Sequence, residues 1–131
     1  YELRLSSILK KGTDVWLNTP RYTREASGTS GMTAAMNGAI NFSIPDGWFP
    51  EFARHGENAF VIPVSPSASP EEQDKEESGK LLDILSDEII PTYYGAPRKW
   101  VDIMKASMRD VLPYFDSDRM AKEYYEKLYN Y

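Results

Sequence analysis

Two short β-prone runs with a helical stretch between them constrain the fold of this sequence most. Residues 14–17 and 39–43 are rich in the apolar side chains that favour strands, and the second run alternates apolar and polar residues. Residues 29–36 lie between them at helical spacing, and residues 58–62 form a third strand-like run before Pro63. The order strand, helix, strand predicts the α/β class with a short parallel sheet.

Local signals indicate where these elements begin and end. Residues 2–11 place apolar side chains at roughly helical spacing, with Gly12 as the expected C-cap. Ser30 is the expected N-cap of the short helix, and Asn37-Gly38 is typical of a left-handed stop. We expect residues 14–17 to form a buried strand, with Trp16 in the core.

The second half of the chain has a different composition. Residues 64–79 are rich in Ser, Pro and acidic side chains, which predicts a loop or a mobile insertion. Helical spacing resumes at Lys80, again at Pro97, and a third time after an N-cap at Asp116 or Ser117. We therefore expect one structural domain with an α/β site segment over 1–63, an acidic loop over 64–79 and a helical C-terminal tail over 80–131.

Composition excludes several kinds of site. The 131 residues include no cysteine and one histidine, which argues against disulfides, thiolate chemistry and a multi-histidine metal site, so no metal is expected.

The net charge of -5 argues against a nucleic-acid partner, which needs a basic surface. No apolar run reaches the ~20 residues of a membrane span. With no signal peptide and no initial Met, we expect a cytoplasmic protein of which this chain is a fragment.

The run from Glu25 to Gly31 carries the chemistry, because it follows a strand and opens a helix. Ligands of open α/β sheets bind beyond the carboxyl ends of the strands. Gly28 and Gly31 allow close approach of the backbone, and the amides at a helix start attract anions. The carboxylate of Glu25 suits sugar hydroxyls. Hydroxyl groups are supplied by Ser27, Thr29 and Ser30. An ordinary helix start with a solvated Glu25 explains the same pattern.

Three segments resemble the α-glucan phosphorylase family: Gly12–Pro20, Glu25–Gly38 and Asp46–Trp48. The match is tight from Gly12 to Ile62 and looser through the C-terminal helices. The resemblance implies the second Rossmann-like domain of the two-domain GT-B glycosyltransferase fold. It also implies a retaining enzyme that acts on α-1,4-glucan (glycogen or starch) with phosphate or glucose 1-phosphate, completed by an N-terminal part of the same chain.

The resemblance also implies roles for the site residues. The equivalent of Glu25 binds hydroxyls of the glucosyl unit, and backbone groups of Ser27 and Gly28 help to hold the same sugar. The resemblance places Thr29, Ser30 and Gly31 beside the phosphate of a pyridoxal 5′-phosphate cofactor.

One position departs from the family. Thr33 occupies the place of the lysine that anchors the cofactor, and a hydroxyl group cannot form an imine. Three alternatives follow: a phosphorylase that binds the cofactor without a covalent bond, a cofactor-free synthase that uses a nucleotide sugar, and a glucan-binding homologue without catalysis. The fragment alone is expected to be inactive.

Four other side chains have two interpretations each, and the rest are expected to be solvated. Trp48 and Phe49 would either stack on sugar or pack beneath the loop. Arg21 and Arg24 would meet a phosphate or lie solvated, and His55 is expected to be a solvated loop residue. The acidic set is expected to form a solvated face: Glu71, Glu72, Asp74, Glu76 and Glu77.

The tyrosines of the C-terminal helix are expected to pack against another domain. They are Tyr124, Tyr125, Tyr129 and Tyr131. In a fragment such surfaces would be exposed, as would the edges of its incomplete sheet. We therefore expect exposed apolar surface and self-association, with a homo-oligomer as one outcome.

Overall fold

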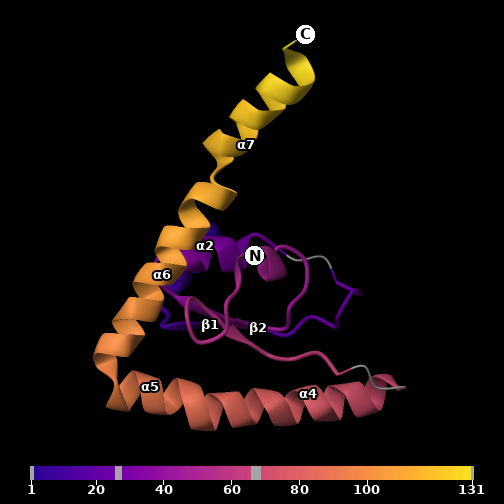
Figure 1. Ribbon diagram of the computed structural model, residues 1–131, viewed down its shortest axis with the longest axis vertical. Helices are drawn as coiled ribbons and strands as arrows, with labels where there is room; N and C mark the ends of the chain where they lie inside the picture. The colour runs from indigo at the N-terminus through magenta and orange to yellow at the C-terminus, as the bar shows by residue number, and fades with distance from the viewer. Residues whose placement is uncertain (1, 26–27, 66–68, 131) are drawn as a thin grey trace.

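The computed structural model describes residues 2–25, 28–65 and 69–130, and these form a small sheet flanked by helices (Figure 1). The first half contains α1 (Leu3–Gly12), β1 (Val15–Asn18), α2 (Ser30–Met36), β2 (Ile40–Ser43), α3 (Phe49–Phe52) and β3 (Phe60–Val61). The second half is helical, and η marks a π-helical turn. It contains α4 (Pro70–Ile84), η1 (Leu85–Ile89), α5 (Ile90–Gly95), α6 (Pro97–Phe115), α7 (Ser117–Tyr124) and η2 (Tyr125–Tyr129).

The three strands form a parallel sheet in the order β1-β2-β3. Val15 pairs with Ile40, and Phe42 pairs with Phe60. All four residues of the central strand β2 are buried, as expected for a parallel strand covered on both faces. The prediction of an α/β fold with a short parallel sheet is therefore confirmed.

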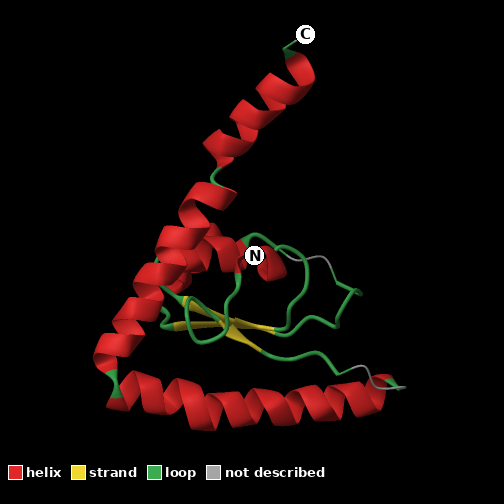
Figure 2. Ribbon diagram, in the orientation of Figure 1, coloured by secondary structure: helices red, strands yellow, loops and turns green. Residues whose placement is uncertain are grey.

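Helices cover the sheet on two sides (Figure 2). α4, η1 and α5 run along one side, and α2 lies on the other. α6 passes from α5 towards α2, so it joins two apolar clusters. Its residues Trp100 and Ile103 pack with Phe42 and Phe60 in the larger cluster. Val111 packs with Trp48 in the smaller one, which lies beside α2 and α3.

The strand β1 is less buried than its sequence predicts. Val15 and Trp16 are half-buried, and the Leu17 residue is 52% exposed. β1 lies at an edge of the sheet and has a neighbouring strand on one side only. The expectation of a buried strand with Trp16 in the core is wrong for this reason.

The acidic segment is largely helical, which corrects the loop predicted over 64–79. α4 starts at Pro70, and the hydroxyl of its N-cap Ser69 accepts a hydrogen bond from the Glu72 amide at 3.2 Å. Serine before the helix, proline at its first position and glutamate at its third are a helix-start signal. Glu77 and Ile84 are buried, so tertiary packing stabilises this polar helix as well.

The helical run continues past α4 because of a change in its hydrogen bonding. The Ile90 amide donates to the Leu85 carbonyl, which is the wider π-helical pattern of η1. Pro91 follows and has no amide to donate to the carbonyl four residues before it. The π-helical turn thus accommodates the proline, and α4 and α5 lie nearly in line (Figure 1).

The helix ends agree with most of the local signals. Asn37 caps α2, and Gly38 follows with a φ of 94°, as the stop signal predicts. Asp116 caps α7 through a hydrogen bond from the Arg119 amide at 3.4 Å. Two details differ: Ser30 is the first helical residue of α2 rather than its N-cap, and α1 is capped by Thr13.

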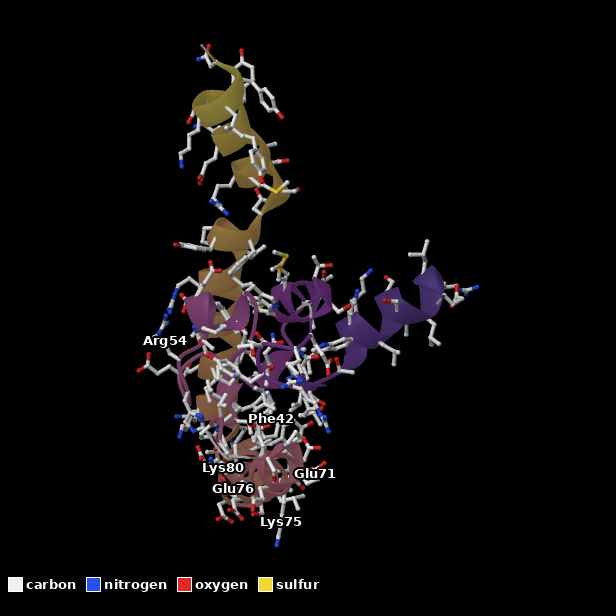
Figure 3. All side chains as sticks on the ribbon, turned by 90° about the vertical axis from the view of Figure 1, so that its right-hand side faces the viewer. Phe42, Arg54, Glu71, Lys75, Glu76 and Lys80 are labelled. Atoms are coloured by element: carbon white, nitrogen blue, oxygen red, sulfur yellow. The ribbon has the colours of Figure 1, made fainter. Side chains whose placement is uncertain are left out.

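Two helices extend away from the sheet. α7 continues the line of α6 beyond the body in Figure 1, and the indigo α1 projects sideways in Figure 3. Both carry exposed apolar side chains, including Leu3 of α1 at 75% and Tyr124 of α7 at 51% exposure. Within the described ranges, none of the helices has both the length and the apolar character that crossing a membrane requires.

Candidate functional site

A cavity of about 350 Å³ lies at the carboxyl ends of the three strands, and we call it the strand-end cavity. The residue that directly follows each strand lines it: Thr19, Ile44 and Ile62. α4 forms the facing wall through Asp74, Glu77, Ser78 and Leu81. This edge is where open α/β sheets bind their ligands.

Glu25 lines the strand-end cavity from the loop after β1. The residue is exposed, and its Oε1 atom accepts a hydrogen bond from the Arg21 backbone amide at 3.3 Å. A carboxylate has about four acceptor positions, so Glu25 retains capacity for ligand hydroxyls. The structure thus places Glu25 at a cavity, and its role towards a sugar stays a prediction.

Carboxylates dominate the charge around this cavity. Arg21 forms an ion pair with Asp74, at 2.5 Å between Nη2 and Oδ2. Glu77 is buried, and its Oε1 accepts hydrogen bonds from the Ser65 amide at 3.3 Å and from Gln73 Nε2 at 2.8 Å. Three carboxylates with one paired guanidinium favour a neutral ligand rich in hydroxyl groups over an anion.

The acidic set on α4 therefore divides between two environments, which corrects the expectation of a uniformly solvated face. Asp74 and Glu77 line the strand-end cavity. Glu71 and Glu72 lie in the first turn of α4, where the helix dipole favours negative charge. In Figure 3 Lys75 points away from the body of the molecule, so this helix presents one side to solvent.

A second cavity, of about 260 Å³, lies at the start of α2, and we call it the α2 cavity. Gly28, Ser30 and Gly31 line it together with aromatic and amide side chains. These come from β1, β2 and the segment before α3: Trp16, Leu17, Asn18, Asn41, Ser43, Trp48 and Phe49. No ionisable side chain occurs among the described residues that line it, so backbone amides, hydroxyls and carboxamides supply its polarity.

The two cavities lie on opposite sides of the strand ends. Ser43 lines the α2 cavity, and the next residue, Ile44, lines the strand-end cavity. Successive side chains of a strand point to opposite faces, which explains the division. The predicted site residues are accordingly separated, with Glu25 at one cavity and Gly28, Ser30 and Gly31 at the other.

Gly31 and Asn41 join α2 to β2. Asn41 is almost fully buried, and its Nδ2 donates to the Gly31 carbonyl at 3.0 Å. Asn41 is not among the site residues predicted from sequence, although a polar residue between the apolar Ile40 and Phe42 of a buried strand is a signal of a specific hydrogen bond.

The threonines of the run do not line either cavity. Thr29 is the exposed N-cap residue of α2, and its side chain makes no capping hydrogen bond. Thr33 is half-buried, and its Oγ1 donates to the Thr29 carbonyl at 3.1 Å, one turn back along the helix. Ser27 lies outside the described residues.

The aromatic residues before and in α3 act in packing. Trp48 and Phe49 are buried, and the Trp48 ring lies 5.5 Å from Phe52 and 5.1 Å from Phe115 between ring centroids. Both residues line the α2 cavity as part of its wall. Of their two interpretations, packing beneath the loop agrees with this burial.

His55 is exposed, as expected for a loop residue, and both nitrogens of its ring also have partners. The Val61 amide donates to Nδ1 at 3.0 Å, and Nε2 lies 2.9 Å from Glu88 Oε2. Because Nδ1 accepts a hydrogen bond, the proton of the neutral ring lies on Nε2 and points to Glu88. His55 thereby links the loop before β3 to η1 and lies outside both cavities described above.

Comparison with known proteins identifies what this segment resembles. Maltodextrin phosphorylase of Thermococcus litoralis is 42% identical over 132 residues, which covers 99% of this chain. Glycogen phosphorylases of Mycobacterium tuberculosis and Aquifex aeolicus are each 37% identical over 135 residues, which cover 98% and 99% of this chain. No protein-family model matches it.

This sequence is homologous to a segment of the α-glucan phosphorylases. The resemblance predicted from its motifs is confirmed. The chain spans 16% of the length of the maltodextrin phosphorylase and 19% of that of the Aquifex glycogen phosphorylase. The parallel sheet agrees with the predicted α/β class, and the larger GT-B arrangement stays a prediction.

Phosphorylase homology raises the question of pyridoxal 5′-phosphate, which the resemblance implies. Thr33, which the resemblance predicts to stand at the anchoring position, has a hydroxyl that donates to the Thr29 carbonyl of its own helix and cannot form an imine. The seven residues of α2 include no lysine. The residues present therefore do not fit a cofactor held by a covalent bond at this position.

Proposed function

We propose that this chain supplies the glucosyl-binding part of a phosphorylase-type retaining glycosyltransferase. The intact protein would transfer glucosyl units between α-1,4-glucan and phosphate, with glucose 1-phosphate as the other substrate. Similarity to proteins named maltodextrin and glycogen phosphorylase over nearly all of the chain supports this proposal most strongly. The position of Glu25 at the strand-end cavity agrees with it.

The chemistry of the strand-end cavity supports a sugar ligand. Glu25 accepts hydrogen bonds from sugar hydroxyls, and bonds to a charged acceptor are the stronger kind. Asp74 and Glu77 add negative charge, and the Arg21 guanidinium is already paired. A phosphate would be repelled there, whereas a glucosyl unit has donors for the carboxylates.

The start of α2 is the proposed phosphate side of the site. Its N-terminal amides, at Thr29, Ser30 and Gly31, carry the positive end of the helix dipole. The α2 cavity has no carboxylate among its described lining residues, unlike the strand-end cavity. Sugar and phosphate would therefore occupy different sides of the strand ends, and the rest of the protein would close the cleft.

Assay of the intact protein tests this function. With glycogen and inorganic phosphate, we expect release of glucose 1-phosphate. Glu25→Gln removes the charge of the acceptor and is expected to lower kcat/KM about tenfold or more. Glu71→Gln makes the same change at an exposed position on α4 and should have little effect. Absence of product, with or without added pyridoxal 5′-phosphate, would contradict the proposal.

A glucan-binding homologue without catalysis is the second candidate, and Thr33 favours it. Thr33→Lys restores an amine at the anchoring position, so cofactor capture would appear as absorbance in the pyridoxal band. If the wild-type protein binds glycogen without releasing glucose 1-phosphate, and this variant gains activity, then loss of the lysine explains the loss of turnover.

The nucleotide-sugar synthase is less well supported by these residues. A sugar diphosphate calls for cationic partners. Arg21 is the one cationic side chain among the described residues that line the two cavities, and it is paired with Asp74. Glucan elongation from a nucleotide sugar, measured beside phosphorolysis, separates the two activities.

A further inference from the structure

The loop that carries Glu25 contains a strained backbone position. Thr23 has a φ of 61°, and within the described residues it is the one non-glycine residue with a positive φ. This left-handed region is rarely adopted by a β-branched side chain. A conformation of this kind persists where surrounding contacts hold it in place.

Asp46, in the turn after β2, makes the contact that holds this position. Its Oδ2 accepts a hydrogen bond from the Thr23 amide at 3.0 Å. Its Oδ1 accepts one from the Gly47 amide at 2.8 Å. The two oxygens thus bind backbone amides of two different loops, one after β1 and one after β2.

The position of Thr23 affects where the Glu25 carboxylate lies. The Arg24 amide donates to the Arg21 carbonyl at 2.9 Å, which closes a turn around Thr23. The Arg21 amide then donates to Glu25 Oε1 at 3.3 Å. The turn around Thr23 and the Glu25 carboxylate are therefore connected by hydrogen bonds. From this position Glu25 lines the strand-end cavity.

The ion pair between Arg21 and Asp74 also holds this loop, but it is weaker than the hydrogen bond to Asp46. The side chains of Arg21 and Asp74 are 56% and 49% exposed, and solvent screens ion pairs of this kind. The Asp46 bond goes to a backbone amide and fixes the conformation of the turn directly. Of these two contacts, the hydrogen bond to Asp46 is the one that determines the backbone conformation of the turn.

We propose that Asp46 is a positioning residue for Glu25. Its carboxylate holds the turn around Thr23 in the left-handed conformation and so keeps Glu25 at the strand-end cavity. The consequence for sugar binding rests on the proposed function, whereas the consequence for the loop does not. Loss of the Asp46 bond would let Thr23 relax and move the Glu25 carboxylate from the cavity.

Asp46→Asn tests this role in the intact protein, because it keeps the size of the side chain and replaces one acceptor oxygen by a donor. The Thr23 and Gly47 amides then compete for one acceptor oxygen, so the bond to the Thr23 amide is weakened. Asp102→Asn makes the same chemical change at an exposed position on α6 and serves as the control. Amide hydrogen exchange of the peptide over residues 19–25 reports the loop, and kinetics with glucose 1-phosphate report the site.

We expect faster exchange of that peptide in Asp46→Asn and unchanged exchange in Asp102→Asn. We also expect KM for glucose 1-phosphate to rise about tenfold with kcat nearly unchanged, because Glu25 binds a part of the sugar that does not react. A general loss of folding would instead speed exchange across the chain and lower kcat.

Unchanged exchange over residues 19–25 would overturn the role of Asp46. Faster exchange with an unchanged KM in an active enzyme would overturn the link to Glu25. An intact wild-type protein without phosphorolytic activity would contradict the proposed function instead, and the exchange data would still decide whether Asp46 holds the loop.

Discussion

Gly31 lies where the backbone of α2 closely approaches its neighbours. A Cβ atom there would lie 2.8 Å from Asn41 Oδ1 and 3.0 Å from Trp48 Cζ2. Both neighbours are buried, and Asn41 is held by its hydrogen bond to the Gly31 carbonyl. Gly31 is therefore required by packing between α2 and β2, in addition to any role at a ligand.

We expect Gly31→Ala to lower the free energy of unfolding by about 1–3 kcal/mol, because a buried side chain must move to make room. Chemical denaturation of the protein measures this change. Gly28→Ala is the matched control, since nothing lies within 4 Å of its Cβ position. Equal destabilisation by the two substitutions would contradict the packing argument.

At the scale of elements, an ion-pair network joins the loop before β3 to α6. Asp110 accepts hydrogen bonds from Asn58 Nδ2 at 3.0 Å and from Arg109 Nε at 2.9 Å, and it is bonded to Arg54 as well. Burial raises the pKa of Asp110, but the hydrogen bonds from Arg109, Asn58 and Arg54 lower it more, so the pKa lies below its ordinary value.

A lowered pKa in the folded state means that ionised Asp110 stabilises the fold. This contribution is present above the unfolded-state pKa of about 3.9 and is lost as the pH falls through the folded-state pKa. We expect Asp110→Asn to lower the free energy of unfolding by about 1–2 kcal/mol at neutral pH. It should also weaken the loss of stability in acid, as measured by denaturation at pH 7 and below pH 4. If Asp110→Asn lost stability in acid as steeply as the wild-type protein does, the role of ionised Asp110 would be contradicted.

The helix α4 is a second element whose stability depends on one residue at its start. The Ser69 hydroxyl caps this helix, and α4 carries the Asp74 and Glu77 side chains of the strand-end cavity. We expect Ser69→Ala to lower the free energy of unfolding by about 1 kcal/mol, measured by thermal denaturation. Thr29→Ala is the control, because the N-cap side chain of α2 makes no capping bond. If Ser69→Ala lowered the free energy of unfolding less than Thr29→Ala does, this account would be contradicted.

At the scale of the whole molecule, α1 and the C-terminal helix present apolar side chains to solvent. Leu5 and Ile8 are 55% and 58% exposed, and Tyr125 is 62% exposed. Tyr131, the last of the four tyrosines expected to pack on another domain, lies outside the described residues. Surfaces of this kind mark contacts with other protein surfaces.

We expect the chain expressed alone to self-associate through these helices, with an apparent mass that rises with concentration in light scattering. Replacing Leu5 and Ile8 together by Lys should reduce the association, because it places charge on the apolar face of α1. Ser7→Lys adds charge at an exposed polar position and should reduce the association less. A strictly monomeric wild-type chain would contradict this expectation.

Parts of the fold could be predicted from sequence because their signals are local. The Asn37-Gly38 stop, the cap at Asp116 and the alternating strand over β2 each depend on a few neighbouring residues. The start of α4 has an equally local signal at Ser69-Pro70, whereas the acidic and proline-rich composition around it favours a loop. The position of Glu25 beyond a strand end followed from the order of elements.

Sequence alone thus determined the order of the three strands, the kind of sheet and the segment from which Glu25 comes, because these depend on side chains close together in the chain. Tertiary structure alone decided that Trp16 is half-buried, that Glu77 is buried and that Asp46 binds the Thr23 amide. Parallel pairing brings the ends of β1 and β2 together, so a contact between residues 23 positions apart has no local signal.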